Sequence, residues 1–314
     1  MSVVVVGSFV QDHCWSTERF PVIGETRVGR FSTGPGGKGF NQAVACHRQG
    51  VDTLFVGALG DDALALVARN FAHSEGLKSH WQVSAERPTA TSSIVIDGEG
   101  RNLIVVDLAA NQTLTAAFAS EAIGSATRIV LTQCETPLAV AHAVAGRATE
   151  IGALMVLNPA PMHEPLTPEL LALVDVLTPN ETEFAALMDS VGQRIDPAGV
   201  AQRNDLDLHA LARTLGVPTV VITLGAAGVF VSHGRNRRGD ADAYYRVAPA
   251  AVNAIDTTGA GDAFSGALVA ALAFAPEAPF ADAVRHANLA AGLACERLGT
   301  ATAMVDRAAV LSRS

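Results

Sequence analysis

The chain has 314 residues, of which 49% are hydrophobic and 17% charged, a composition typical of a compact globular protein rather than a disordered one. Its formal net charge of −9, with no run of Lys or Arg to offset it, argues against nucleic acid as a partner. No stretch is apolar over the length of a membrane span, and the four scattered cysteines predict reduced thiols in a cytoplasmic protein rather than disulfides or a zinc site.

Apolar runs recur along the chain with the lengths of strands that are buried on both faces of a sheet. These runs cover residues 3–6, 53–56, 128–131, 153–157, 174–177 and 219–223. Helical patterns, such as those over 137–150 and 206–215, separate the later runs. Strands that alternate with helices predict a parallel sheet covered on both faces, so we expect an α/β fold.

Two segments interrupt this alternation. The first, 13–33, contains Pro21 and Gly24, and the second, 91–107, has strand-like runs on either side of a turn over 97–100. The second segment predicts a hairpin. Together the two are expected to form a small sheet that projects from the main domain, although a surface hairpin without a role fits the spacing equally.

A Gly-rich segment, Gly34-Pro-Gly-Gly-Lys-Gly39, matches the pattern G-x-G-x-x-G. A dinucleotide-binding fingerprint would follow the first strand directly, but that strand ends at Gly7. A phosphate-binding Walker loop would have Ser or Thr after Lys38, where this chain has Gly39.

We predict instead that this segment approaches a polyol, just before a helix that begins near Phe40. Glycine lets a backbone come close to a ligand, and its amides can then donate hydrogen bonds. The donors would be the amides of Gly36 and Gly37 and the side chains of Lys38 and Asn41.

The most informative run, Asp256-Thr-Thr-Gly-Ala-Gly-Asp262, ends where an apolar helical pattern begins. Unpaired N–H groups at a helix N-terminus hold an anion, and Gly259, Ala260 and Gly261 allow it to approach. A carboxylate beside such a site repels anions, so Asp262 is best explained as a base that takes a proton from a hydroxyl while the amides stabilise a transferring phosphoryl group. We therefore expect a kinase for a small hydroxylated substrate. The structural alternative is that this run is only a tight turn with a helix cap.

Five segments in this order resemble the signatures of the ribokinase-like (PfkB) family of carbohydrate and nucleoside kinases. They are the runs 36–45, 157–161, 178–183, 223–228 and 256–262. The resemblance extends nearly end to end. It implies one domain over residues 1–314, a three-layer α/β/α fold with a mostly parallel central sheet, and a small β-sheet lid formed by about 10–35 and 89–110.

The resemblance also implies an activity, the ATP-dependent transfer of the γ-phosphoryl group to the primary hydroxyl of a small sugar, ribose or a close pentose. Asp262 would be the base, and the amides from Gly259 to Gly261 the anion hole. The lid would cover the sugar and exclude water, and in family dimers the lids pack together, so a homodimer is expected.

Family site residues carry over position by position. The sugar would be bound by Asp12, Gly36, Gly37, Lys38, Asn41, Glu135 and Asp262. ATP would be bound by Asn180, Thr223, Gly225, Gly228, Gly261 and Asn288. Mg²⁺ would be held, through water, by Asn180 and Glu183, a pair that would equally serve as a capped helix start. An activating K⁺ would be bound by Asp256 and the carbonyls of Thr258, Ala294, Arg297 and Gly299.

Two positions depart from the family pattern. Val10 stands where ribose-specific members usually have an Asn that contacts the sugar, and Ala303 stands where a Ser often completes the cation site. Loss of a buried polar partner can admit another substrate, so a nucleoside kinase is the alternative, to be decided by Val10 and by Ser92 and Ser93 near the sugar or base.

Two other classes stay open but explain less. A non-catalytic sugar or nucleotide sensor would have no need of Asp262. A nicotinamide-dependent oxidoreductase would leave that carboxylate without a role and the Gly-rich fingerprint in the wrong place.

Overall fold

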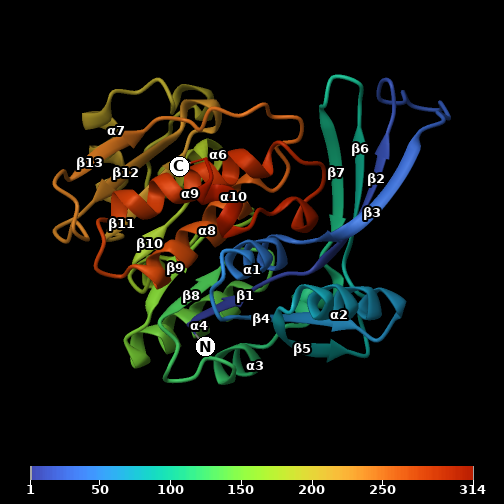
Figure 1. The fold of residues 1–314 in the computed structure, drawn as a ribbon, viewed down its shortest axis with the longest axis horizontal. Coiled ribbons are helices and arrows are strands. Elements are labelled where there is room, and N and C mark those ends of the chain that lie inside the picture. The colour runs from blue at the N-terminus through green and yellow to red at the C-terminus, as the bar shows by residue number, and fades with distance from the viewer. Residues whose placement is uncertain (1, 314) are drawn as a thin grey trace.

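Nine strands of the computed structural model, which describes residues 2–313, form one central sheet (Figure 1). In spatial order they are β13 (Tyr244–Val247), β12 (Val229–His233), β11 (Thr219–Thr223), β10 (Val176–Leu177), β9 (Leu154–Leu157), β8 (Ile129–Thr132), β1 (Val3–Val6), β4 (Thr53–Gly60) and β5 (Lys78–Ser84). Neighbours from β5 to β11 pair in parallel, whereas β12 and β13 pair antiparallel at one edge. The mostly parallel sheet expected from the sequence is confirmed.

The burial of a strand affects whether an apolar run in the sequence predicts it. All four residues of β1 are fully buried, because the strand is paired on both sides and covered on both faces. The edge strand β5 is only partly buried and has no continuous apolar run, so the sequence pattern did not predict it.

Helices cover both faces of the sheet, as the three-layer expectation requires. One face carries α1 (Lys38–Arg48), α2 (Ala63–Glu75), α8 (Ala260–Phe274), α9 (Phe280–Ala294) and α10 (Arg307–Leu311). The opposite face carries α3 (Ala116–Glu121), α4 (Leu138–Ile151), α5 (Pro168–Leu171), α6 (Glu181–Ser190) and α7 (Asp205–Thr214). Short 3₁₀ helices lie between these elements: η1 (Ala109–Thr113), η2 (Pro197–Gly199), η3 (Gly225–Ala227) and η4 (Ala301–Ala303).

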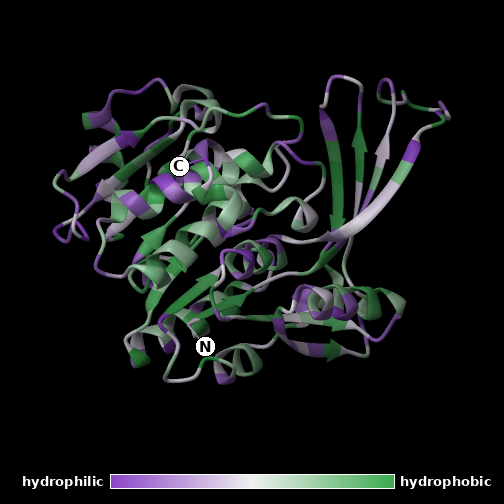
Figure 2. Ribbon diagram, in the orientation of Figure 1, coloured by the Kyte–Doolittle hydropathy of each residue, from purple (hydrophilic) through white to green (hydrophobic). Residues whose placement is uncertain are grey.

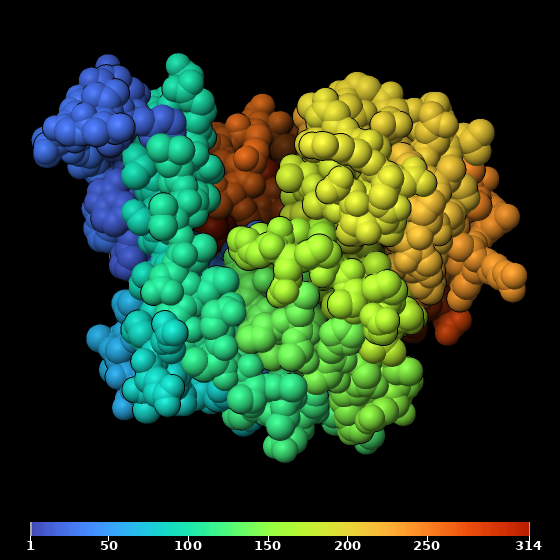
Figure 3. Space-filling view, turned by 180° about the vertical axis from the view of Figure 1, so that it is seen from behind, coloured from blue at the N-terminus to red at the C-terminus, as the bar shows by residue number. Residues whose placement is uncertain are grey.

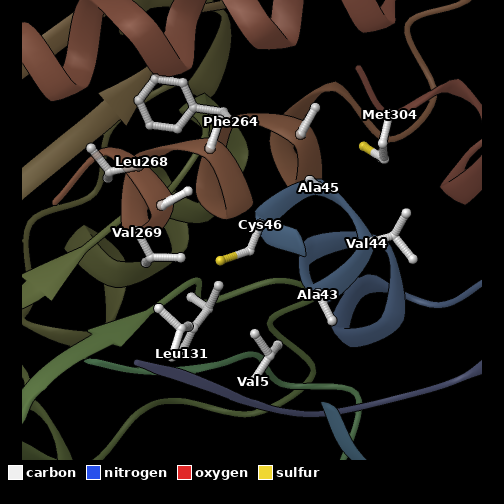
Figure 4. Close-up of a cluster of buried hydrophobic side chains, with 14 of the residues drawn as sticks. Val5, Ala43, Val44, Ala45, Cys46, Leu131, Phe264, Leu268, Val269 and Met304 are labelled. Carbon is white, nitrogen blue, oxygen red and sulfur yellow. The ribbon is translucent and has the colours of Figure 1, made fainter. Parts of the chain in front are cut away.

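The contact between α1 and α8 brings the two most informative sequence segments together. In Figure 4, Cys46 of α1 points toward Val269 of α8, and Val5 and Leu131 of the sheet lie below them. Gly266 makes this approach possible, because a Cβ at that position would lie 2.4 Å from the carbonyl oxygen of Gln42 on α1. Close helix packing therefore places the N-terminal turn of α8 beside the first turns of α1.

Four further strands form a second, smaller sheet that projects from the main one (Figure 1). In order they are β3 (Arg30–Gly36), β2 (Val10–Ser16), β6 (Thr91–Ile96) and β7 (Asn102–Asp107). Strands β2 and β6 are parallel and the other pairs antiparallel, so the hairpin expected at 97–100 is present. Figure 3 shows this sheet standing apart from the body, with a hollow between the two.

Strand β7 is exposed along its whole length although it is largely apolar, as its green colour in Figure 2 shows. The apolar residues are Leu103, Ile104, Val105 and Val106. In the part of the chain that the structure describes, no helix combines the length and hydropathy needed to cross a bilayer.

Candidate active site

The functional residues gather where the parallel strands of the central sheet end. In a parallel sheet the carboxyl ends of the strands lie on one edge, and loops from that edge form the binding crevice. Segments that follow β9, β10 and β11 meet the N-terminal turn of α8 at this edge. Ser8 and Gln133, which follow β1 and β8, reach the same region through hydrogen bonds to Glu135 and Gln42. A cavity of about 530 Å³ and a smaller one of about 140 Å³ lie side by side on this edge and share Asn180 and Gly261 as lining residues.

Asp262 lies in the first turn of α8 and is almost completely buried. Each of its carboxylate oxygens accepts a hydrogen bond from α1: Oδ2 from Nδ2 of Asn41 at 3.0 Å, and Oδ1 from Nε2 of Gln42 at 2.9 Å. Burial raises the pKa of Asp262, and the nearby Lys38 and the two amide donors only partly offset that effect. A carboxylate with a raised pKa is a stronger base, which suits the abstraction of a hydroxyl proton.

The turn before Asp262 provides a glycine-lined anion site. Gly259 is the N-cap of α8 with a φ of 78°, a left-handed conformation that glycine adopts without strain. The amide of Ala260 donates to the carbonyl of Thr257 at 3.2 Å, whereas the amides of Gly259 and Gly261 have no acceptor within residues 2–313. The amide of Ala260 is therefore not free to bind an anion as expected, because it already donates within the turn; the amides of Gly259 and Gly261 remain.

Asp12 lies on β2 and is held by two hydroxyl groups that the sequence did not single out as its partners. Its Oδ1 accepts from Oγ of Ser92 at 2.6 Å, and its Oδ2 accepts from Oγ1 of Thr300 at 3.1 Å. Burial raises the pKa of Asp12 against the effect of these two bonds. Gly36 lies directly against this carboxylate, because a Cβ there would be 2.0 Å from Oδ2 of Asp12.

Glu135 follows β8 and is anchored from two other segments. Oε2 accepts hydrogen bonds from Oγ of Ser8, just after β1, and from the amide of Lys38 at 3.0 Å. Ser8 is fully buried, and sequence reasoning missed it because a single serine after a strand gives no pattern. Gly37 joins β3 to α1 with a φ of 89°, so the amide of Lys38 lies at the start of that helix.

Lys38 lies among four carboxylates that come from distant parts of the chain. Burial lowers its pKa, but the surrounding Asp262, Glu135, Glu183 and Asp12 outweigh that effect, and the pKa of the ammonium is raised. Lys38 is therefore a permanent cation at the centre of an otherwise acidic site. Such a charge offsets repulsion between these carboxylates and an incoming phosphate.

All six residues expected to bind ATP line the larger cavity. They are Asn180, Thr223, Gly225, Gly228, Gly261 and Asn288. Nδ2 of Asn288 donates to the carbonyl of Ala248 at 2.7 Å, which fixes the loop opposite. The rest of the lining was not predicted and is apolar except for Glu181 and Thr257; it includes Pro249, Val252 and Phe264. A slot of this size with apolar walls can accept a planar base.

Asn180 and Glu183 form a capping box at the start of α6. The Glu183 amide donates to Oδ1 of Asn180 at 2.9 Å, and the Glu183 carboxylate accepts from the amide and Nδ2 of Asn180 at 2.9 and 3.0 Å. Burial raises the pKa of Glu183, which lines the smaller cavity together with Asp262.

This geometry limits how a metal could bind. No group of three His, Cys, Asp or Glu among residues 2–313 could enclose an ion. Both Glu183 oxygens already accept a hydrogen bond, so they suit the water shell of Mg²⁺ better than direct coordination. The residues present therefore fit a magnesium ion that is carried by phosphates and water.

Asp256 joins the two loops expected to hold a monovalent cation. Its Oδ1 accepts from the amide of Thr258 at 2.9 Å, and its Oδ2 accepts from the amide of Gly299 at 3.1 Å. The carbonyl of Ala294 accepts from the amide of Arg297 at 3.1 Å. These contacts bring the expected ligands into neighbouring turns.

The residues expected to decide between substrates lie in different environments. Val10 is buried with Ala90 and Ala109. Ser92 reaches Asp12, but Ser93 is exposed, because successive residues of a strand face opposite sides. The expectation that Ser93 faces the sugar is therefore wrong.

Comparisons with known proteins show what this chain is similar to. The family model described as pfkB family carbohydrate kinase matches residues 1–307. A ribokinase of Haemophilus influenzae is 34% identical over 311 residues, which cover 98% of this chain and 96% of that protein.

Two solved structures are similar over nearly their whole length. The ribokinase of Giardia lamblia has a TM-score of 0.87 at 26% identity, covering 99% of this chain and 97% of that one. The ribokinase of Arabidopsis thaliana, solved with ribose and ATP, has a TM-score of 0.81 at 27% identity, covering 99% of this chain and 97% of that one.

Proposed function

The chain belongs to the pfkB family of carbohydrate kinases, and we propose that it transfers the γ-phosphoryl group of ATP to the primary hydroxyl of D-ribose. The observation that carries this proposal is the position of Asp262, a buried carboxylate beside unpaired amides and between two groups of binding residues. The ribokinase relatives favour ribose over the nucleoside considered as an alternative.

In the proposed reaction Asp262 accepts the proton of the primary hydroxyl. The hydroxyl oxygen forms a bond to the γ-phosphorus, the bond from that phosphorus to the β,γ-bridging oxygen breaks, and ADP leaves with the electron pair. Asn41 and Gln42 hold the carboxylate in place, so little reorganisation is needed at the moment of proton transfer. The proton then passes from Asp262 to solvent when the product leaves.

Charge on the transferring group would be stabilised from two sides. The amides of Gly259 and Gly261 would donate to its oxygens, and the ammonium of Lys38 would offset the negative charge around them. Asn180 and Glu183 would hold the water shell of Mg²⁺, which when bound supplies charge neutralisation at the phosphates.

Recognition of the sugar would fall to Asp12 and Glu135, which present carboxylate oxygens to its hydroxyls. Each is already oriented by protein donors: Ser92 and Thr300 hold Asp12, and Ser8 holds Glu135. Buried acceptors that are fixed before binding discriminate strongly against a substrate without the matching hydroxyl. Val10 is proposed to tune this preference from its place two residues before Asp12 on the same strand.

A monovalent cation, K⁺ by preference, is proposed beside the anion hole. Support comes from Asp256, which bridges the turn of Thr258 and the loop of Gly299. A cation bound there would order the turn that carries Gly259 without entering the chemistry. Ala303, which offers no hydroxyl, predicts activation rather than an absolute requirement.

We also propose a homodimer formed through the projecting sheet, which would act as a lid over the sugar. Leu103, Ile104 and Val105 are each more than half exposed, and β7 is an unpaired edge. A second copy packed on β7 would bury the exposed apolar side chains and pair the open edge. Sedimentation velocity would measure the mass of the particle and so show whether a dimer forms. A Val105→Asp variant should then sediment as the monomer.

The four cysteines, Cys14, Cys46, Cys134 and Cys295, are free thiols. Free thiols persist in reducing compartments, and ATP is consumed there, so the cytoplasm is the proposed location.

The first test is ADP release from ATP–Mg²⁺ with K⁺ across ribose, 2-deoxyribose, fructose, adenosine, inosine, cytidine and uridine. The proposal predicts the highest kcat/KM for ribose. A higher kcat/KM for any nucleoside would replace ribose by that nucleoside, and no turnover on any of them would favour a sensor.

A further inference from the structure

A chain of buried amide side chains leads to Asp262 from the ends of the central strands. Nε2 of Gln133 donates to Oε1 of Gln42 at 2.6 Å, and Nε2 of Gln42 donates both to Oδ1 of Asp262 at 2.9 Å and to Oδ1 of Asn158 at 3.0 Å. Asn158 in turn donates through Nδ2 to the carbonyl of Thr178 at 2.7 Å. The chain thus links segments after β8, β9 and β10 to the expected base.

The hydrogen bonds fix which way round each amide lies. The carbonyl of Thr178 can only accept, so Asn158 must turn its Nδ2 toward it and its Oδ1 toward Gln42. Gln42 must then present Nε2 to Asn158 and Asp262 and Oε1 to Gln133. The opposite orientation of Gln42 would bring acceptor against acceptor at Asp262 and Asn158.

The fold makes room for this arrangement at Gly7, the residue after β1. A Cβ at position 7 would lie 2.0 Å from Oε1 of Gln133. Glycine there lets the Gln133 side chain lie across the end of β1 and reach Gln42. The glycine that ends the first strand therefore serves the site as well as the turn.

Gln42 and Asn41 differ in what they can still bind. Asn41 donates to Asp262, but its own Oδ1 is buried without a partner, so it can accept a hydrogen bond from a substrate hydroxyl. Gln42 is fully buried and both of its Nε2 protons and its Oε1 are engaged inside the protein. Gln42 can act on the reaction only through Asp262.

We infer that Gln42 is a positioning residue for Asp262, and that Gln133 and Asn158 orient Gln42 for this purpose. This inference rests on the proposed function, in which Asp262 is the base. By donating to Oδ1, Gln42 favours the ionised form of the Asp262 carboxylate against the effect of its burial. The same bond orients the other oxygen, Oδ2, toward the substrate. Without that donor, Asp262 would hold its proton at higher pH and would lose its orientation.

The test compares three Gln→Met variants, because Met is unbranched and of similar length but cannot donate. Gln42→Met removes the donor to Asp262, and Gln133→Met removes the group that orients Gln42. Gln49→Met is the matched control: Gln49 is the C-cap of α1, the helix that contains Gln42, is also buried, and bonds to the carbonyl of Val305 and to His286, away from the site. It should affect stability but not the pH dependence of catalysis.

Gln42→Met is expected to lower kcat at neutral pH about 10- to 100-fold, the range for a lost hydrogen bond to a charged group. The acid limb of its kcat–pH profile should move upward by about one pH unit or more, because protonated Asp262 is inactive. The KM for ATP should stay unchanged. Gln133→Met should shift the limb in the same direction by less, and the limb of Gln49→Met should match that of the unmodified enzyme.

A second readout does not depend on catalysis. In protein labelled with ¹³C at aspartate Cγ, the Asp262 signal is assigned by its absence from Asp262→Asn, and its titration gives the pKa directly. An upward shift in Gln42→Met but not in Gln49→Met supports the inference. Unchanged titration and an unchanged acid limb in both Gln42→Met and Gln133→Met would overturn it. If the unmodified enzyme phosphorylates no sugar, the proposed function fails, while the titration still decides the role of Gln42.

Discussion

The two sides proposed for the active site would bind by different physical means. The nucleotide side is a cavity of about 530 Å³ walled largely by glycine, alanine, valine and backbone. The proposed sugar side is a set of carboxylates fixed by hydrogen bonds from other segments, together with the ammonium of Lys38, whose charge these carboxylates surround. In this proposal, the shape of the cavity would accept a base and phosphates, whereas the fixed carboxylates would recognise a particular pattern of hydroxyls.

Asp262 lies at the boundary between these sides, in a turn whose Gly261 lines the cavity proposed for the nucleotide and whose carboxylate is held by α1. A change on one side should therefore alter one KM and spare the other. Only changes at the boundary should reduce kcat itself.

The largest expected effect comes from the boundary. Asp262→Asn should lower kcat by about 10³-fold or more, because no base remains to take the hydroxyl proton. The Kd for ATP, measured by calorimetry, should change little since the amides of Gly259 and Gly261 are retained. Retention of kcat within tenfold of the unmodified enzyme would remove Asp262 from the role of base.

A smaller effect, confined to the sugar side, is expected from Gly36→Ala. The new methyl group would displace the Asp12 carboxylate, which Ser92 and Thr300 hold 2.0 Å from the Cβ position. The KM for ribose should rise about 10- to 100-fold, as expected for a lost hydrogen bond to a charged group, while the KM for ATP stays the same.

Gly34→Ala is the control for this variant, since a Cβ at Gly34 has open space around it. It should leave both KM values unchanged in steady-state assays. Equal effects of the two substitutions would mean that the contact of Gly36 with Asp12 is irrelevant to sugar binding.

On the nucleotide side, Asn288→Ala should raise the KM for ATP about two- to fivefold and leave that for ribose unchanged. Its amide stabilises the cavity wall through one hydrogen bond to Ala248, and such a bond contributes about 0.5–1.5 kcal/mol. A rise in the KM for ribose instead would place Asn288 in the wrong half of the site.

The smallest effect concerns stability. Burial raises the pKa of Asp262 in the folded state, so its ionised form destabilises the fold above that pKa, and protonation relieves the cost as the pH falls. Asp262→Asn should therefore raise Tm at pH 7 by about 2–4 °C, and the gain should shrink as the pH is lowered through the folded-state pKa. Thermal unfolding at several pH values checks this, and a lower Tm for the variant at pH 7 would contradict it.

Local signals gave the sequence its predictive value. Apolar runs predict the central strands, and the glycines before α1 and α8 predict turns in which the backbone has a positive φ. The partly exposed edge strand β5, the antiparallel strand β12 and the antiparallel edge strand β13 were missed. Their pairing depends on neighbours that no short pattern encodes.

The supporting residues of the site were missed for a related reason. Ser8, Thr300 and Gln133 are single polar residues that meet their partners across 91 to 288 positions of sequence. Gln42 lies inside a segment that sequence analysis did select, but nothing local distinguishes it from its neighbours. Ser93 was wrongly expected to face the sugar. Which residues of β6 face inward depends on the register of β6 with β2, and the sequence of β6 alone does not show that register.

The most direct test of the central claim compares ribose with 5-deoxyribose, which lacks the primary hydroxyl, by following ATP and its products with ³¹P NMR. The account predicts a phosphomonoester signal and stoichiometric ADP with ribose, and neither with 5-deoxyribose. A phosphomonoester formed on 5-deoxyribose would show transfer to another hydroxyl and would contradict the proposed geometry of Asp262.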